Sequence, residues 1–451
     1  MGFKEEFESK VKGTVERFEL VKPGEKVLVA CSGGKDSTTV LYLLKKLGCE
    51  VEGLYIDLLI GEYSQKNLEN IQKFCEQEKI KLQVVNIREV LGSSMCFIRQ
   101  KIPQLKACTV CGVIKRWLLN KKARELGFSK IATGHNLDDQ AETLLLQLLR
   151  GAGPHGLAAM PTLRENAAGA AWWRPLLGVT RASIDAYARD SGLAWIDDES
   201  NADRRHTRNA VRETVLPALL AIAPQADATL ARAAAHQAEA ARLLDELAQH
   251  DAQGAIDGAT LQSAALGRLS PHRARNLLRW FLRCQGLPAP SSARLSAMLD
   301  QLRGARIDAS IRLAHAGVEI GVHRGRIALH ATPPASFDVR WRGEKELALP
   351  HGTIAFGRAD GAGIDLARLG ADVRVRSRAG GERFQVAPDR PRRALKSILR
   401  DAGIPPWERR GLPLVFSGDV LAAVAGLGID ADITAAPGRP GLTVAWHPRL
   451  P

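Results

Sequence analysis

The chain has 451 residues, 45% of them hydrophobic and 25% charged, which excludes collagen-like and disordered proteins, and no apolar run reaches the roughly 18–20 residues that span a bilayer. The formal net charge of +14 favours a polyanionic partner such as nucleic acid, although surplus arginine on a solvated surface gives the same number. Three of the first six residues are charged, and the apolar stretch of a secretory signal is missing, so we expect a cytoplasmic protein that does not enter a membrane.

Short apolar runs alternate with amphipathic stretches through the first third of the chain. The apolar runs predict strands at 26–31, 51–57, 82–87 and 130–133. The amphipathic stretches predict helices at 38–47, 64–79, 112–126 and 138–150. This alternation predicts an α/β fold with a doubly wound parallel sheet.

The remainder of the chain predicts two further domains. An Ala/Arg/Leu-rich helix at 224–250 leads into a small, mostly helical domain, and Pro333-Pro334 marks a linker. The last part has the pattern of a small α/β domain. We therefore expect domains at 1–220, 221–332 and 333–451.

The basic residues change type along the chain. Residues 1–130 hold 18 Lys and 5 Arg, whereas residues 131–451 hold 2 Lys and 38 Arg. A domain boundary rarely exchanges lysine for arginine so completely. We interpret the change as a chimeric chain joined between about 130 and 150, with a natural protein that has an unusual N-terminal domain as the alternative.

A glycine-rich loop lies between the first predicted strand and helix. It reads Ser32-Gly33-Gly34-Lys35-Asp36-Ser37. A loop that opens a helix presents backbone N–H groups and the helix dipole to an anion, and serine and lysine side chains add donors. Asp36 suits a magnesium-bridged phosphate. The Walker pattern G-x-x-x-x-G-K-[ST] is absent, so an ordinary P-loop NTPase is excluded.

A second acidic motif, GHNLDDQAET at 134–143, follows the last predicted strand of the sheet. Asp138 and Asp139 would therefore lie at a helix start on the ligand-binding edge. They either cap the helix or, with Asp36, hold magnesium.

Both motifs resemble one group of enzymes. The loop resembles the PP-loop of the N-type ATP pyrophosphatase family, and the second motif resembles the HxxDDxxET segment of PP-loop tRNA-modifying enzymes. The resemblance implies ATP cleavage between the α- and β-phosphates, with residues 32–37 gripping the leaving pyrophosphate.

Residues 1–135 resemble the tRNA thiolation branch of these enzymes, in CSGGKDST, LYIDLLIGEYSQ and the pair Cys108 and Cys111. A C-x-x-C pair by itself suits zinc, an iron–sulfur cluster, a redox disulfide or two buried thiols. In the thiolation branch the pair and a distant third cysteine ligate a [4Fe–4S] cluster. That third cysteine is missing here, because Cys284 falls in another predicted domain.

Residues from about 136 to 451 resemble bacterial tRNA(Ile)-lysidine synthetase. The matching segments are DDQAETLLLQLLRGAGPHGLAAM, WRPLLGVTRASI, DDESNADRRHTRNAVRETVLP and GGERFQVAPDRPRRALKSILRDAGIPPWERRGLPLV. The resemblance implies an ATP-dependent ligase that joins L-lysine to the wobble cytidine of isoleucine tRNA with a CAU anticodon. Arg116, in an Arg-aromatic step of that family, would stabilise charge at the α-phosphate or hold the tRNA.

Two further arginine-containing segments have more than one interpretation. Residues 198–201, with Arg208, Asn209 and Arg212, either pack against the active site or form a capped helix with solvated arginines. The C-terminal basic cluster favours tRNA binding over a merely solvated face; its members are Arg374, Arg376, Arg378, Arg383, Arg390, Arg392, Arg393, Lys396 and Arg400.

The expected function is lysidine synthesis, in which Asp36, Arg116, Asp138 and Asp139 carry the chemistry and the cofactors are ATP and Mg²⁺. A thiolase that uses Cys108 and Cys111 is one alternative, and a tRNA-binding chimera without turnover is another. The sequence leaves the oligomeric state open, with a homodimer as one option.

Overall fold

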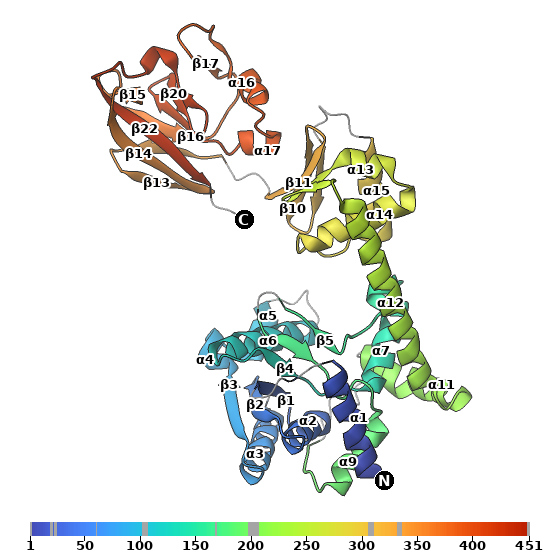
Figure 1. The fold of residues 1–451 in the computed structure, drawn as a ribbon. Helices are drawn as coiled ribbons and strands as arrows, with labels where there is room; N and C mark the ends of the chain where they lie inside the picture. Colours follow the sequence, from blue (N-terminus) through green and yellow to red (C-terminus); the bar gives the residue numbers. More distant parts are fainter. Residues whose placement is uncertain are drawn as a thin grey trace. The chain divides into compact units, whose positions relative to one another are not determined.

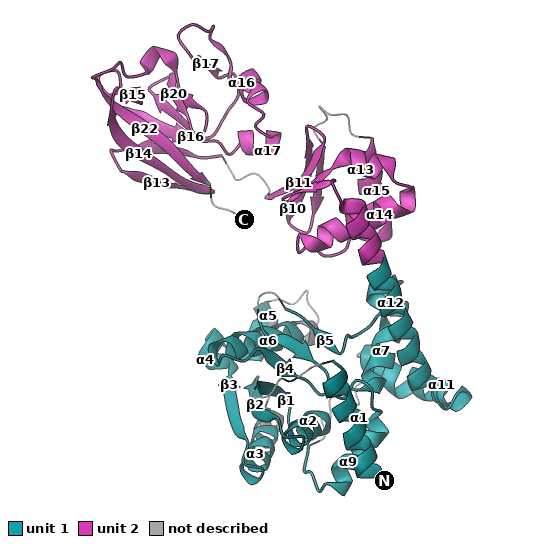
Figure 2. Ribbon diagram, viewed as in Figure 1, with its two compact units in different colours: residues 1–243 teal, residues 244–451 magenta. Residues whose placement is uncertain are grey.

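The computed structural model describes residues 2–18, 21, 25–59, 61–101, 107–166, 169–196, 207–304, 311–331 and 336–448 (Figure 1). The chain divides into two compact units, residues 1–243 and 244–451 (Figure 2).

The first unit is built on a six-stranded sheet in the order β3-β2-β1-β4-β6-β5. Five strands are parallel and β5 runs antiparallel on the edge. The strands are β1 (Lys26–Cys31), β2 (Glu50–Asp57), β3 (Lys81–Asn86), β4 (Lys130–Ala132), β5 (Leu163–Arg164) and β6 (Ala171–Trp173). The strand order reverses between β1 and β4, and ligands of such sheets bind at the carboxyl ends of the strands at this point. The doubly wound fold expected from the sequence is confirmed.

Helices cover both faces of this sheet because successive strand residues point to opposite sides. Val27 and Val29 of β1 enter one core, and Leu28 between them enters the other. The first core takes side chains from α1 (Phe3–Arg17), α2 (Lys35–Lys46), α3 (Gly61–Gln77) and α9 (Arg181–Asp190). The second takes them from α4 (Ile87–Leu91), α5 (Met95–Lys101) and α6 (Ala107–Glu125).

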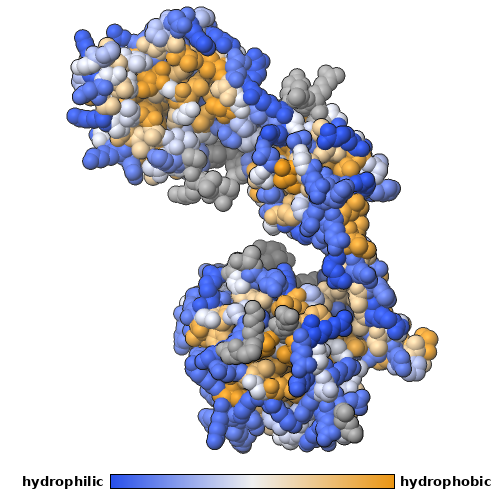
Figure 3. All heavy atoms as spheres, viewed as in Figure 1, coloured by the Kyte–Doolittle hydropathy of each residue, from blue (hydrophilic) through white to orange (hydrophobic). Residues whose placement is uncertain are grey.

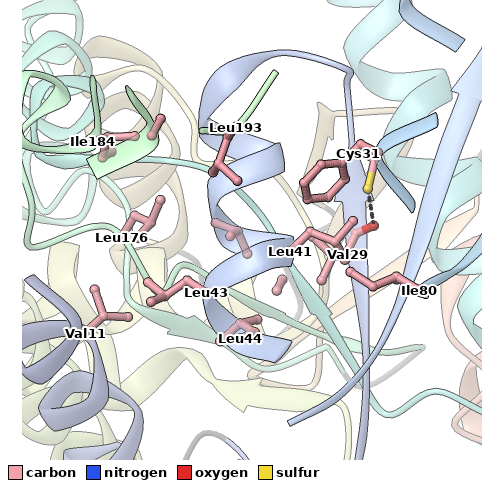
Figure 4. Close-up of a cluster of buried hydrophobic side chains, with 14 of the residues drawn as sticks. Val11, Val29, Cys31, Leu41, Leu43, Leu44, Ile80, Leu176, Ile184 and Leu193 are labelled. Carbon is pink, nitrogen blue, oxygen red and sulfur yellow. Dashed lines mark hydrogen bonds between the residues drawn. The ribbon is translucent and has the colours of Figure 1, made fainter. Parts of the chain in front are cut away.

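The first core fixes α2 against the sheet. Figure 4 shows Leu41 of α2 beside Val29 of β1, and Leu43 on the side of α2 that faces Leu176. The Cys31 thiol donates a hydrogen bond to the Val29 carbonyl at 3.4 Å (Figure 4). The buried face of α2 therefore holds the loop between β1 and α2 in a fixed place.

Further helices lie between β4 and β5 and after α9. These helices are α7 (Leu137–Leu148), α8 (Pro154–Leu157), α10 (Thr207–Ala210), the π-helical turn η2 (Val211–Val215), α11 (Leu216–Ile222) and α12 (Ala226–Ala252). Ile222, the last residue of α11, is exposed, and Figure 3 shows hydrophobic surface at the end of this helix. Within the described ranges no single helix has the length and apolarity to cross a membrane, whereas the bent pair 207–222 and 226–252 meets both criteria together.

The second unit begins with a small domain that holds more strand than the sequence predicted. Its antiparallel sheet has the order β7-β8-β11-β10-β9. Its elements are β7 (Ile256–Asp257), β8 (Thr260–Gln262), α13 (Ser263–Arg268), α14 (Pro271–Cys284), α15 (Ser292–Arg303), β9 (Arg312–His315), β10 (Val318–His323) and β11 (Arg326–Ala331). Two-residue turns at Ala316-Gly317 and Arg324-Gly325, all with positive φ, join β9 to β10 and β10 to β11. Two-residue turns of this kind match the twist of a β-hairpin. The glycines at 317 and 325 are therefore the sequence feature that could have predicted the three strands β9, β10 and β11.

The last part of the chain packs two antiparallel sheets, with orders β12-β16-β19-β20-β21 and β13-β14-β22-β15, and a two-stranded ribbon β17-β18. Its strands are β12 (Asp338–Trp341), β13 (Glu346–Leu349), β14 (Gly352–Asp360), β15 (Ile364–Asp365), β16 (Val373–Arg376), β17 (Arg383–Phe384), β18 (Arg393–Ala394), β19 (Leu414–Ser417), β20 (Val420–Val424), β21 (Gly428–Ile429) and β22 (Pro440–Pro448). Its described helices are α16 (Leu395–Asp401), α17 (Pro406–Arg409) and the short η3 (Ala431–Ile433).

Candidate active site

The glycine-rich loop lies between the end of β1 and the start of α2, where the sequence placed it. The Ser32 N–H donates to Ser37 Oγ at 3.1 Å, and Ser37 Oγ donates to the Gly34 carbonyl at 2.9 Å. Gly33 has a φ of +80°, and a Cβ on it would lie 2.6 Å from Asn67 Oδ1 of α3. Only glycine therefore fits at 33, and the loop presents two serine hydroxyls at a helix N-terminus, which is a favourable position for an anion.

Lys35 and Asp36 begin α2 and differ in their partners: the lysine is paired with an acid, whereas the aspartate is buried with one oxygen that bonds to none of the described residues. The Lys35 ammonium forms an ion pair with Asp185 of α9. Asp36 Oδ2 accepts a hydrogen bond from the Asn136 amide at 3.1 Å, whereas its buried Oδ1 has no hydrogen-bond partner among the described residues. Burial, followed by the charge of Asp139, raises the pKa of Asp36 to about 6, against the opposing effect of nearby cations. The carboxyl group is thus close to changing its charge near neutral pH.

The second motif meets the loop at the end of β4. A Cβ on Gly134 would lie 2.8 Å from the Asp36 carbonyl carbon, so the two segments are in direct contact. Asn136 then caps α7, because its Oδ1 accepts the Asp139 N–H at 3.0 Å and its own N–H donates to Asp139 Oδ2 at 3.1 Å. This reciprocal capping box points the Asp139 carboxylate back toward Asp36.

The two adjacent aspartates of this motif have different neighbours. Asp138 Oδ2 accepts the Arg181 N–H at 2.7 Å, at the first residue of α9. Asp139 Oδ1 lies 3.2 Å from Arg212 Nη2. The structure therefore brings Asp36 and Asp139 together and sets Asp138 against the start of α9. In the part of the chain that is described, no three or more His, Cys, Asp or Glu side chains are grouped to hold a metal ion.

Glu142, one turn beyond, is fully buried and contacts three arginines. Its carboxylate lies 3.3 Å from Arg181 Nη2, 3.0 Å from Arg208 Nε and 2.7 Å from Arg212 Nε. Arg212 belongs to the π-helical turn η2 and contacts Asp139 as well. Of the two interpretations of Arg208 and Arg212, the structure supports packing against the site. Residues 198–201 lie outside the described residues.

His135 lies between the strand end and the capped helix. Its Nδ1 is 2.8 Å from Thr133 Oγ1. Burial lowers the pKa of His135 to about 4; the charge of Asp139 opposes this shift, and Arg174 and Arg208 add to it. The imidazole is therefore neutral at pH 7.

Arg116 and the cysteine pair lie on α6, away from these contacts. The Arg116 side chain is exposed and makes no hydrogen bond or ion pair with the described loop and motif residues. Cys111 is partly buried on the same helix, and the Cys108 side chain falls outside the described residues. The structure does not bring Arg116 to Asp36 and Asp139.

Acidic residues neutralise much of the C-terminal basic cluster. The ion pairs are Arg374–Asp338 (2.9 Å), Arg378–Glu382 (3.1 Å), Arg392–Asp430 (2.6 Å) and Arg393–Asp401 (2.8 Å). Asp338 and Asp430 come from segments distant in sequence, so counting arginines along the chain overstates the free positive charge.

The sheet order, the phosphate loop and the facing carboxylates define a nucleotide-binding α/β domain of the PP-loop class, which uses ATP. Family models agree: a PP-loop domain matches residues 3–219, a TilS substrate binding domain matches 261–328, and a TilS substrate C-terminal domain matches 373–446.

Relatives with curated names extend this match over the whole chain. The tRNA(Ile)-lysidine synthase of Nitrosomonas europaea is 39% identical over 440 residues, covering 95% of this chain and 93% of the relative. That of Ralstonia nicotianae is 41% identical over 349 residues, covering 74% of each. The chain belongs to the tRNA(Ile)-lysidine synthase family. Among solved structures, the U34-tRNA thiolase NcsA from Methanococcus maripaludis is similar, with a TM-score of 0.45 and 23% identity, over 51% of this chain and 77% of that one.

The family match continues through the change from lysine to arginine. The PP-loop model spans residues 3–219, and the alignment with the Nitrosomonas protein also runs across 130–150. A chimeric join in that interval stays a prediction.

Proposed function

We propose that this protein joins L-lysine to C2 of the wobble cytidine in isoleucine tRNA with a CAU anticodon. The cytidine C2 oxygen attacks the α-phosphorus of ATP, and the bond to the β-phosphate oxygen breaks to release pyrophosphate. The lysine ε-amine then attacks C2 and loses a proton, and AMP leaves with the C2 oxygen. Family membership supports this reaction, and the contact between Asp36, Asn136 and Asp139 at the sheet's switch point is the observation that carries it.

The loop at 32–37 would hold the phosphates of ATP. Its serine hydroxyls and the first N–H groups of α2 lie at one helix N-terminus, where negative charge is stabilised. The Lys35 ammonium, which forms an ion pair with Asp185, would add to this attraction. The leaving pyrophosphate would therefore rest on this loop.

A magnesium ion fits between the two motifs. Asp36 Oδ1 is buried and without a hydrogen-bond partner among the described residues, and Asp139 is close enough to raise the pKa of Asp36. Mg²⁺ commonly uses one or two carboxylates together with substrate phosphates. Asp36 and Asp139 would hold the ion. Asp138, the third carboxylate predicted from the sequence, accepts the Arg181 N–H instead. When bound, the ion would offset negative charge that develops on the phosphates.

The arginines around Glu142 would keep Asp139 in place. Arg181 and Arg212 each approach both the Asp139 and the Glu142 carboxylates, and these ion pairs fix the direction of the Asp139 side chain. Arg116 is exposed on α6, which supports contact with tRNA over charge stabilisation at the α-phosphate. The C-terminal basic cluster would also hold tRNA. A cytoplasmic location belongs to the proposal.

Measuring the two products separately tests this order of events. With ATP, magnesium and unmodified tRNA but no lysine, we expect about one pyrophosphate per tRNA and AMP retained on the tRNA. Lysine should then release AMP. Asp36→Ala should abolish pyrophosphate release and leave tRNA binding intact. Pyrophosphate release without tRNA, or unchanged turnover by Asp36→Ala, would contradict the proposal.

A further inference from the structure

Arg174 lies on the ligand-binding edge of the sheet, directly after β6. β6 runs parallel to β4, with Trp173 opposite Ala132. The Thr133 N–H donates to the Trp173 carbonyl at 2.9 Å, which continues the pairing beyond the end of β4. Arg174 is therefore beside the segment that carries His135 and Asn136, two strands away from the phosphate loop that follows β1.

Arg174 is a buried cation that has no acidic partner among the described residues. Only 8% of its surface is exposed. Its Nη1 donates to the Pro161 carbonyl at 2.6 Å, and its buried Nε has no hydrogen-bond partner among the described residues. No carboxylate of the described residues forms an ion pair with it, in contrast to Arg181 and Arg212, which contact Asp139 and Glu142.

The surroundings of Arg174 add further positive charge. Burial, followed by the charge of exposed Arg164, lowers its pKa to about 10, so the guanidinium remains charged at pH 7. Its charge also lowers the pKa of His135, which indicates that the two side chains are near each other. A buried charge is costly unless an opposite charge pairs with it. The site therefore favours an anion.

A purely structural role does not require this charge. The neighbouring carbonyl, that of Met160, is held by the neutral amide of Gln140, which donates to it at 2.9 Å and accepts the Met160 N–H at 2.9 Å. An amide would hold the Pro161 carbonyl equally well. The guanidinium adds a permanent charge and a second donor edge, the features that bind phosphate.

We propose that Arg174 receives a phosphate group distinct from the pyrophosphate held by residues 32–37. Two strand spacings, or about 10 Å, separate the backbone of β6 from that of β1, which favours a phosphate at Arg174 other than the one on the loop. The group is either the α-phosphate of ATP or a phosphodiester of the tRNA. This inference rests on the proposed function for its two phosphate sources.

The test compares Arg174→Met and Arg174→Lys with the control Arg164→Gln, a neighbouring cation that is exposed. ATP affinity is measured by calorimetry without tRNA. The affinity for tRNA is measured at several salt concentrations without ATP. If ATP supplies the phosphate, Arg174→Met weakens ATP binding about tenfold or more. If tRNA supplies it, the salt slope falls in magnitude by about one. The salt slope is the slope of the logarithm of the tRNA association constant against the logarithm of the salt concentration.

Arg174→Lys keeps the charge and loses the planar fork, so it should retain the salt slope and bind the affected ligand more weakly than wild type. This variant preserves the test if Arg174→Met does not fold. Arg164→Gln should leave ATP affinity unchanged. Unchanged ATP affinity and salt slope in both Arg174 variants would overturn the inference. Neither binding measurement depends on lysine transfer, so failure of the proposed reaction would be seen separately.

Discussion

The Asn136 side-chain amide donates a hydrogen bond to Asp36 Oδ2 at 3.1 Å, which ties the start of α7 to the start of α2 across 100 residues of sequence. The same side chain caps α7 through the Asp139 N–H. One asparagine therefore sets the relative positions of the two carboxylates assigned to magnesium.

Asn136→Asp separates these two roles. Aspartate caps a helix as well as asparagine does, so the stability of α7 should be kept. The variant loses the amide donor and adds negative charge beside Asp36, which should raise the pKa of Asp36 further. In the pH profile of pyrophosphate release, we expect the acidic limb to move upward by about one unit. An unmoved limb would show that this hydrogen bond does not control Asp36.

Gly33 and Gly34 form a matched pair for testing the loop. Gly33→Ala places a Cβ 2.6 Å from Asn67 Oδ1 on a backbone with positive φ, whereas Gly34→Ala meets nothing closer than Ser32 Oγ at 3.5 Å. Strain of this kind costs about 1–3 kcal/mol, so Gly33→Ala should weaken ATP binding about tenfold or more. Gly34→Ala should bind ATP within about threefold of wild type. Equal losses in both variants would contradict a special requirement at Gly33.

The sequence located the loop and the motif because each is local. Residues 26–31 form β1 within the predicted bounds, and the predicted helix from 38 begins three residues earlier, at Lys35. The helix starts earlier because Gly34 occupies the cap position, so Lys35 and Asp36 already have helical geometry. Strand and helix periodicity therefore sufficed for the four parallel strands β1 to β4, whereas the three-residue parallel strand β6 was missed.

The pairing of side chains could not be predicted in the same way. Asp138 and Asp139 are neighbours in sequence, but side chains one residue apart on a helix point in different directions. Tertiary packing decides that Asp138 contacts the start of α9 and that Asp139 lies near Asp36. Arg174 and Arg181 lie in the segment WRPLLGVTRASI, but the sequence assigned neither of them a role, because their importance comes from burial at the end of β6 and from Glu142. The ion pairs of the C-terminal cluster have the same origin.

The raised pKa of Asp36 predicts how stability changes with pH. Its folded-state pKa is about 6 against an ordinary 3.8, so the folded protein binds the proton more tightly than the unfolded chain. The free energy of unfolding due to this group therefore falls as pH rises from about 4 to 6. Asp36→Asn removes this penalty and should raise the free energy of unfolding by about 1–3 kcal/mol at pH 7.5, with little effect at pH 4.

Urea unfolding of both proteins at the two pH values measures this difference. Pyrophosphate release by Asp36→Asn should be lost at the same time. A variant that is less stable than wild type at pH 7.5 would contradict the assigned surroundings of Asp36.

Glu142 is predicted to matter for stability because three arginines depend on its charge. Glu142→Gln leaves these partly buried cations without their shared partner, and breaking such a pair costs about 3–5 kcal/mol. Glu213→Gln is the control, since Glu213 is exposed on η2 and should change stability by about 0.5 kcal/mol or less. Urea unfolding of the two variants checks the contrast, and similar losses would be inconsistent with the network.

Arg116→Ala distinguishes the two roles considered for this residue. Because the side chain is exposed on α6, we expect the salt slope of tRNA binding to fall by about one and ATP affinity to stay the same. Binding titrations with each ligand give both numbers. A loss of ATP affinity with an unchanged slope would instead place Arg116 at the α-phosphate.

Transfer of labelled lysine to unmodified isoleucine tRNA with a CAU anticodon, in the presence of ATP and magnesium, is the most direct test. Wild type should incorporate about one lysine per tRNA, and Asp36→Ala should incorporate none. Bound tRNA without lysine incorporation would contradict lysidine synthesis. Incorporation of labelled sulfur in its place would identify thiolation, and no turnover of either kind would indicate a chimera that binds tRNA without a working site.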